Sequence, residues 1–65
     1  MSGKWVEFED VKVLKSTANA GQFQFPDGLK RWIPWSQISK ESVDRDGATG
    51  TLICTEWIAE KKGLI

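Results

Sequence analysis

The chain has 65 residues, with 9 lysines and arginines balancing 9 aspartates and glutamates, so its formal net charge at pH 7 is zero. This length allows a single domain with one small core. A neutral chain lacks the strongly basic composition of a typical duplex-DNA-binding protein. Because no apolar run reaches the length of a membrane span or a signal-peptide core, we expect a cytoplasmic protein with no membrane partner.

The side-chain inventory argues against catalysis. The sequence contains no histidine and a single cysteine, Cys54. An internal disulfide is therefore impossible, and the residue that most often acts as a general acid or base at neutral pH is absent. Cys54 lies in an apolar run without an activating neighbour, which indicates a buried, inert thiol. We expect a non-enzymatic protein with no catalytic residues, no cofactor and no metal site.

The first predicted element is a strand over residues 4–15. Its apolar residues form two pairs at alternate positions, Val6 with Phe8 and Val11 with Val13. The two pairs have opposite parity, so a regular strand would point them to opposite faces. A bulge near residues 9–10 would return both pairs to one core, and we predict one there.

A hairpin follows. Residues 17–21 contain Asn and Gly and favour a turn, and residues 22–25 alternate polar and aromatic side chains. Pro26, Asp27 and Gly28 suit a tight turn, since proline fits its second position and glycine a left-handed one. The returning strand is predicted over residues 30–35.

Alternation divides this returning strand into two faces. One face carries Arg31, Ile33 and Trp35, and the other carries Lys30, Trp32 and Pro34. Because Pro34 cannot donate to a strand ladder, the strand ends there or lies at a sheet edge. Ser36 is predicted to cap a helical turn over residues 36–38.

The rest of the chain is predicted as a polar loop over residues 39–50, a strand over 51–54 and a helix over 55–63. Thr55 is placed to cap the helix and Gly63 to end it. A helix of about two turns is unstable alone in water, so its apolar residues must dock on the sheet or on another subunit. These residues are Trp57, Ile58 and Leu64. A homo-oligomer is therefore among the expected assemblies.

Together these elements predict that residues 1–65 form a single small, mainly β domain. Short strands joined by glycine-containing turns favour an SH3-like or OB-like antiparallel curled sheet. We expect a partial barrel of four to five strands with a short C-terminal helix.

The predicted ligand-binding residues are Lys30, Arg31, Trp32 and Trp35. Aromatic rings beside cations suit single-stranded nucleic acid or a nucleotide, because bases stack on the rings and cations hold phosphates. Lys12 and Lys15 are expected on a neighbouring strand. The competing interpretation is that both tryptophans pack in the core or an interface. It is stronger for Trp35, which shares a face with Ile33.

The leading hypothesis is therefore a binding module for nucleic acid or a nucleotide. The alternative is an inhibitor that binds and blocks another protein through its tryptophans and acidic patches. The zero net charge favours this alternative, because a nucleic-acid-binding surface is usually basic.

The stretch Trp32-Ile33-Pro34-Trp35-Ser36-Gln37-Ile38 resembles the part of SH3 domains where a strand ends in a helical turn. That resemblance implies a small barrel, with Pro34 and Trp35 lining a peptide groove. A wider pattern joins this stretch to Phe25-Pro26-Asp27-Gly28 before it and to Glu56-Trp57-Ile58-Ala59-Glu60-Lys61-Lys62-Gly63-Leu64 after it. It resembles small uncharacterised bacteriophage and prophage proteins. This resemblance implies a phage or bacterial setting, in which the alternative function would be that of a phage-encoded inhibitor that binds and blocks a host or defence protein.

Overall fold

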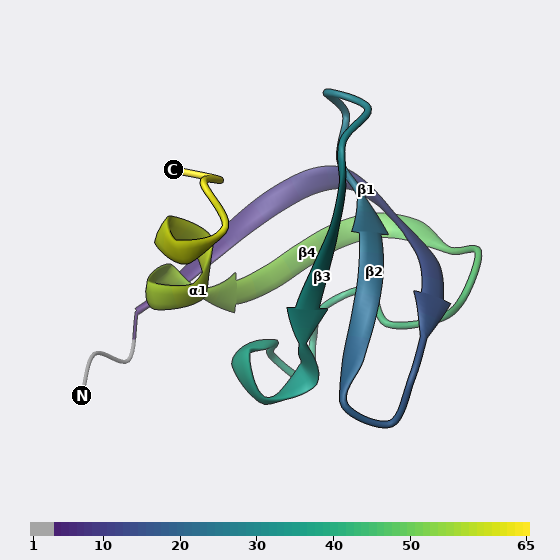
Figure 1. Cartoon of the computed structure of the whole chain (residues 1–65), viewed down its shortest axis with the longest axis horizontal. Helices are drawn as coiled ribbons and strands as arrows, with labels where there is room; N and C mark the ends of the chain where they lie inside the picture. Colours follow the sequence, from purple (N-terminus) through teal and green to yellow (C-terminus); the bar gives the residue numbers. More distant parts are fainter. Residues whose placement is uncertain (1–3) are drawn as a thin grey trace.

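A computed structural model of the chain describes residues 4–65. Four antiparallel strands form one curled, unclosed sheet, which a short C-terminal helix follows (Figure 1). The elements are β1 (Trp5–Ser16), β2 (Ala20–Gln24), β3 (Lys30–Pro34), the 3-10 helix η1 (Trp35–Gln37), β4 (Thr49–Thr55) and α1 (Glu56–Lys61). The strand order is β3-β2-β1-β4. The predicted fold class, a mainly β curled sheet with a C-terminal helix, is confirmed.

The long strand β1 bends where the sequence predicts a bulge (Figure 1). Its pairing with β4 shifts register between Phe8 and Val11, and Asp10 adopts a left-handed φ of 61°. This irregularity reverses the parity of the strand, so Val11 and Val13 are fully buried while Val6 and Phe8 also pack against the core. One strand thereby contributes both of its apolar pairs to the same interior.

The turn between β2 and β3 is tight. The Phe25 amide donates to the Leu29 carbonyl at 3.0 Å, and the Gly28 amide donates back to the Phe25 carbonyl at 2.8 Å. Gly28 has a φ of 87°, which a residue with a side chain rarely adopts. The predicted glycine-dependent hairpin is confirmed, although β2 begins earlier than expected, at Ala20.

The turn after β3 differs from the prediction. The 3-10 helix η1 begins at Trp35, one residue earlier than expected, and Pro34 occupies its N-cap position. No side chain caps it, so the predicted capping role of Ser36 is wrong. The fixed φ of proline, −66° here, already suits this position, and the turn needs no hydroxyl cap.

Residues 38–43 return along the outer edge of β4. Ile38 forms an isolated antiparallel bridge with Cys54. The hydroxyl of Ser42, a buried polar side chain, accepts a hydrogen bond from the Ile53 amide at 3.0 Å. This segment thus satisfies part of the β4 edge that the unclosed sheet leaves free.

The core lies inside the curl of the sheet. Its buried residues come from every strand, from the β2–β3 turn, from the segment after η1 and from α1: Val11, Val13, Phe23, Phe25, Ile33, Ile38, Leu52, Cys54, Ile58 and Ala59. Each strand therefore has one face toward this core and an opposite face toward solvent.

The helix α1 has both predicted ends. The Thr55 hydroxyl accepts from the Ile58 amide at 3.2 Å, and Gly63 has a φ of 73° just beyond the helix. Ile58 docks on the core as expected, but Trp57 is 52% exposed and does not dock on the sheet, so docking on another subunit stays a prediction. Its ring instead lies under the Lys61 ammonium, 5.2 Å from the ring centre. Within residues 4–65, no helix is long and apolar enough to cross a membrane.

Candidate functional site

The strand β3 points its alternate side chains in opposite directions, as predicted. Ile33 is fully buried and Arg31 is partly buried on the inner face. Lys30 and Trp32 are exposed on the outer face, and 41% of the Trp32 surface is accessible to solvent. Two of the predicted binding residues therefore lie on the outside of the sheet.

The register of the sheet extends this outer face across three strands. Outward-pointing residues of β3, β2 and β1 align in two rows: Trp32, Gln22 and Lys15 in the first, and Lys30, Gln24 and Lys12 in the second. Neighbouring strands are about 4.8 Å apart, so each row places its side chains within reach of one ligand. We call these six residues the outer-face patch.

The patch brings Lys12 and Lys15 to the same face as Lys30, but not on the adjacent strand. The strand β2 lies between β1 and β3, so glutamines separate the lysines. This corrects the expectation that the lysines of residues 4–15 lie on a strand neighbouring β3. The arrangement spreads three positive charges over a wide surface instead of concentrating them on one edge.

The patch carries only positive charges, although the net charge of the chain is zero. The patch contains three lysines and no carboxylate. In the described part of the chain, the ammonium groups of Lys12, Lys15 and Lys30 form no ion pair. Acidic residues such as Asp44 and Asp46 belong instead to other segments, here the loop before β4. The patch is a local cationic surface.

Trp35 belongs to the packing of the domain. Its ring meets Phe23 edge-on, with ring centres 5.7 Å apart, and its Nε1 donates to the Thr17 carbonyl at 2.9 Å. The ring also covers Gly21, where an added Cβ would lie 2.7 Å from Trp35 Cζ2. The four predicted binding residues therefore do not share a surface, because Trp35 lies against the core and Trp32 on the outer face.

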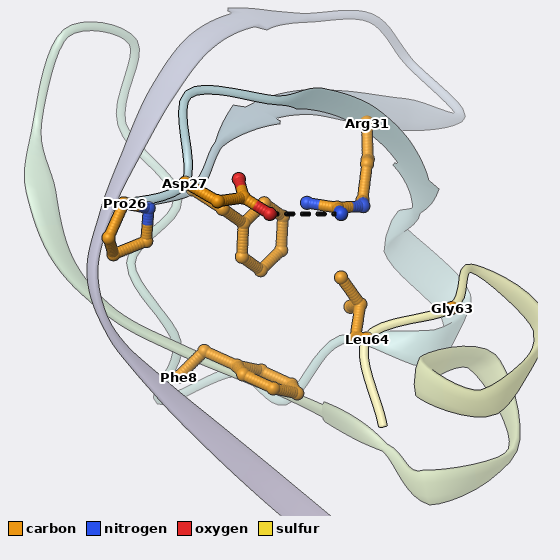
Figure 2. A pocket seen from close by; sticks show the side chains of 7 residues that line it. Phe8, Pro26, Asp27, Arg31, Gly63 and Leu64 are labelled. Atoms are coloured by element: carbon orange, nitrogen blue, oxygen red, sulfur yellow. Dashed lines mark hydrogen bonds and ion pairs between the residues drawn. The ribbon is translucent and has the colours of Figure 1, made fainter.

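Arg31 lines a pocket on the inner side of β3 (Figure 2). The side chain is 16% exposed, its guanidinium lies 4.7 Å from the ring centre of Phe25, and its Nη2 is 3.3 Å from Asp27 Oδ2. The pocket has a volume of about 210 Å³. Its lining comes from β1, the β2–β3 turn, β3 and the segment after α1: Phe8, Phe25, Pro26, Asp27, Arg31, Gly63 and Leu64.

Asp27 is held as a carboxylate at the mouth of this pocket. Its Oδ1 accepts from the Leu29 amide at 2.9 Å. This backbone hydrogen bond, followed by the bond to and charge of Arg31, lowers the pKa of Asp27 below its usual value of 3.8. The Asp27 and Arg31 side chains thus face the pocket as a charged pair at neutral pH.

Cys54 and the acidic side chains are the remaining candidates for chemistry in residues 4–65. Cys54 is fully buried, and burial raises the pKa of its thiol, so the reactive thiolate is disfavoured. Among residues 4–65, no group of three histidine, cysteine or acidic side chains is placed to hold a metal ion. Within residues 4–65, the outer-face patch and the Arg31 pocket both have features suited to binding a ligand.

The sequence prediction missed the glutamines of the patch and most of the pocket. The alternation of polar and aromatic side chains in residues 22–25 predicts that Gln22 and Gln24 point outward. Only the pairing of β2 with β3 shows that they lie beside Trp32 and Lys30. The pocket joins Phe8 to Leu64, and no local pattern signals a contact so distant in sequence. A comparison of the chain with family models, curated proteins and solved structures finds no match.

Proposed function

We propose that the protein is a non-enzymatic binding module that holds single-stranded nucleic acid or a nucleotide on the outer-face patch. The observation that carries this proposal is the register, which aligns an exposed tryptophan with three lysines on one sheet face. Single-stranded nucleic acid needs an aromatic platform for its bases and a cationic surface for its phosphates. The patch offers both.

Each of the three residue types in the patch has its own role in this proposal. A base stacks on the exposed Trp32 ring, an interaction worth about 1–3 kcal/mol. Lys12, Lys15 and Lys30 attract phosphates, and each contact releases counterions from the strand. The glutamines between them have amide groups that can donate to phosphate or sugar oxygens and accept from base amino groups. Duplex DNA is a poorer ligand, because the face of a sheet with three lysines does not enter a groove.

The experiment is a titration of a fluorescently labelled single-stranded oligonucleotide, followed by anisotropy at low salt. We expect Trp32→Ala to weaken binding by about 5- to 150-fold, the equivalent of losing one stacked base. Trp57→Ala is the matched control, because Trp57 is also about half exposed but lies on α1, outside the patch. An equal loss in both variants, or no binding by the wild type, would contradict the proposal.

The salt dependence of the same titration tests the lysines. The logarithm of the binding constant should fall linearly with the logarithm of salt concentration, by about 0.7 per phosphate neutralised. Replacing Lys12, Lys15 and Lys30 with glutamine should remove most of that slope. Lys61→Gln, which changes the same charge on α1, should leave it unaltered.

A second candidate function is the binding of a host or defence protein. It is favoured by Trp5 and Trp57, which are 51% and 52% exposed. Trp5 pairs with Thr55, the residue that caps α1, so both tryptophans belong to the end of the molecule where β1 begins. Exposed aromatic residues are enriched at protein interfaces. This function predicts the opposite mutational pattern, in which Trp5→Ala and Trp57→Ala abolish capture of a purified protein partner and Trp32→Ala does not.

A further inference from the structure

The Arg31 pocket contains a hydrogen-bond donor without an acceptor. Arg31 Nη1 is buried, and no residue in the described part of the chain accepts a hydrogen bond from it. Buried polar groups in proteins are almost always paired, so an orphan donor calls for a specific explanation. Arg31 also lines the pocket, so a ligand there could supply the acceptor if the guanidinium turns slightly toward it on binding.

The neighbouring Asp27 leaves room for such a ligand. Its contact with Arg31 Nη2, at 3.3 Å, is longer than the 2.7–2.9 Å typical of a charge-assisted hydrogen bond. The Asp27 side chain is 52% exposed, and its two oxygens retain free acceptor positions. The pair therefore presents a donor and an acceptor side by side at the pocket.

The size and walls of the pocket limit what it can hold. Its volume, about 210 Å³, is below the roughly 300–1,000 Å³ of pockets for drug-sized ligands. Figure 2 shows Phe8 and Leu64 facing the Asp27–Arg31 pair across the pocket. These apolar walls suit a flat ring and do not suit a hydrated phosphate. The occupant is one ring system whose edge both accepts and donates hydrogen bonds.

We propose that this pocket binds a single nucleobase, with a preference for guanine, and that it extends the nucleic-acid-binding function proposed above. Guanine has a carbonyl oxygen that can accept from Arg31 Nη1. Beside it lie a ring N–H and an amino group that can both donate to the Asp27 carboxylate. Adenine and cytosine offer only an amino group as donor on that edge. Uracil and thymine would turn a second carbonyl toward the negative Asp27.

The position of β3 connects this pocket with the outer-face patch. Arg31 lies between Lys30 and Trp32 in the sequence, and its side chain points to the opposite face. The strand β3 is an edge of the sheet, so no further strand separates the two faces there. A chain of nucleotides passing over this edge places one base in the pocket and its neighbours on the patch.

The test is a ¹⁵N NMR titration of the full chain with the four ribonucleoside 5′-monophosphates. GMP should shift the Arg31 Nε signal and the Gly63 and Leu64 amide signals. It should bind at least about fivefold more tightly than the other three nucleotides. This factor corresponds to the lower end of the discrimination that one bidentate contact to a base provides. Asp27→Asn should remove the preference for GMP, and Lys40→Gln, which changes an exposed lysine outside both the pocket and the patch, should preserve it.

A second variant tests the pocket independently, in case Asp27→Asn changes the fold. Leu64→Phe fills the pocket with a larger apolar side chain and leaves the Asp27–Arg31 pair intact. It should also block the GMP shifts, while labelled oligonucleotide lacking guanine still binds the outer-face patch. Both variants must keep the dispersed spectrum of the folded wild type.

The outcomes separate the two proposals. Pocket shifts with a GMP preference that Asp27→Asn removes support the base pocket. Oligonucleotide binding without any pocket shift overturns the base pocket and leaves the proposed function standing. GMP shifts in the pocket without oligonucleotide binding support the base site and overturn the role of the patch. Equal shifts with all four nucleotides, or no pocket shift with any of them, overturn recognition of a base.

Discussion

The outer and inner faces of β3 carry residues with different roles, some exposed to a ligand and others packed in the domain. On the outer face, Lys30 and Trp32 are exposed and remain available to a ligand. On the inner face, Ile33 is fully buried in the core. Arg31 shares that inner face but ends in a pocket, with one donor unpaired. The alternation of a strand thus separates residues that hold the fold from residues that are free to bind.

The largest loss of stability should come from truncating Ile33, the fully buried residue on the inner face of β3. Ile33→Ala creates a cavity in the core and should lower the free energy of unfolding by about 2–5 kcal/mol. A domain of this size has a total stability of only about 3–10 kcal/mol. Urea unfolding followed by circular dichroism should therefore show a variant that is barely folded or unfolded.

Trp32→Ala is the control for that comparison. Because the ring is exposed, its removal should change the free energy of unfolding by less than about 1 kcal/mol. If Trp32→Ala destabilised the domain as much as Ile33→Ala, Trp32 would be a packing residue. The division between the two faces would then be wrong.

A smaller effect should follow from crowding the inner face at Gly21, which pairs with Ile33. A Cβ at this position would lie 2.7 Å from Trp35 Cζ2 and 3.0 Å from Phe23 Cε1, so the indole must move. We expect Gly21→Ala to cost about 1–3 kcal/mol of unfolding free energy, as overpacked cores do. The change should also alter the near-ultraviolet circular dichroism of the tryptophans.

Gly50→Ala provides a matched control in β4. There the added Cβ would meet Val43 at 3.4 Å, an ordinary contact. It should have the smaller effect and leave the tryptophan signals unchanged. A Gly21→Ala variant as stable as Gly50→Ala would show that Trp35 is not fixed against β2.

The smallest effect should be a pH dependence carried by the inner face. Burial raises the pKa of Cys54 above its usual value of 9.0, so the folded state holds the thiol proton more tightly than the unfolded state. The contribution to stability is complete below about pH 9, the unfolded value, and declines as pH rises through the folded pKa. Cys54→Ala should remove this component. We expect the difference in unfolding midpoint between wild type and Cys54→Ala to narrow above pH 9, and a constant difference would contradict the burial effect.

Much of the fold follows from short-range patterns. Opposite parity of the two apolar pairs in β1 predicts its bulge, and the structure has a register shift and the left-handed Asp10 there. Alternation in β3 predicts which side chains face the core. Thr55 and Gly63 mark the ends of the final helix. Each of these features depends on neighbours within a few residues.

What could not be predicted depends on distant contacts. Lys15 joins the row of Trp32 only because β1 shifts register a second time, between Val13 and Lys15. The exposure of Trp57 depends on which side of α1 meets the sheet, and a helix of this length has too weak a pattern to fix it. The pocket around Arg31 requires the full three-dimensional arrangement.

The strand order has a consequence for how the chain assembles. The ladders of β1 with β2 and of β2 with β3 join segments that are adjacent in sequence, whereas β4 must return across the whole meander to pair with β1. Closing the longer loop costs more entropy, so we expect the β1–β2–β3 meander to form before β4 docks. Until then the apolar side chains of Phe23 and Ile33 face water. The protein is therefore most prone to aggregation before β4 and α1 dock on the meander and cover these side chains.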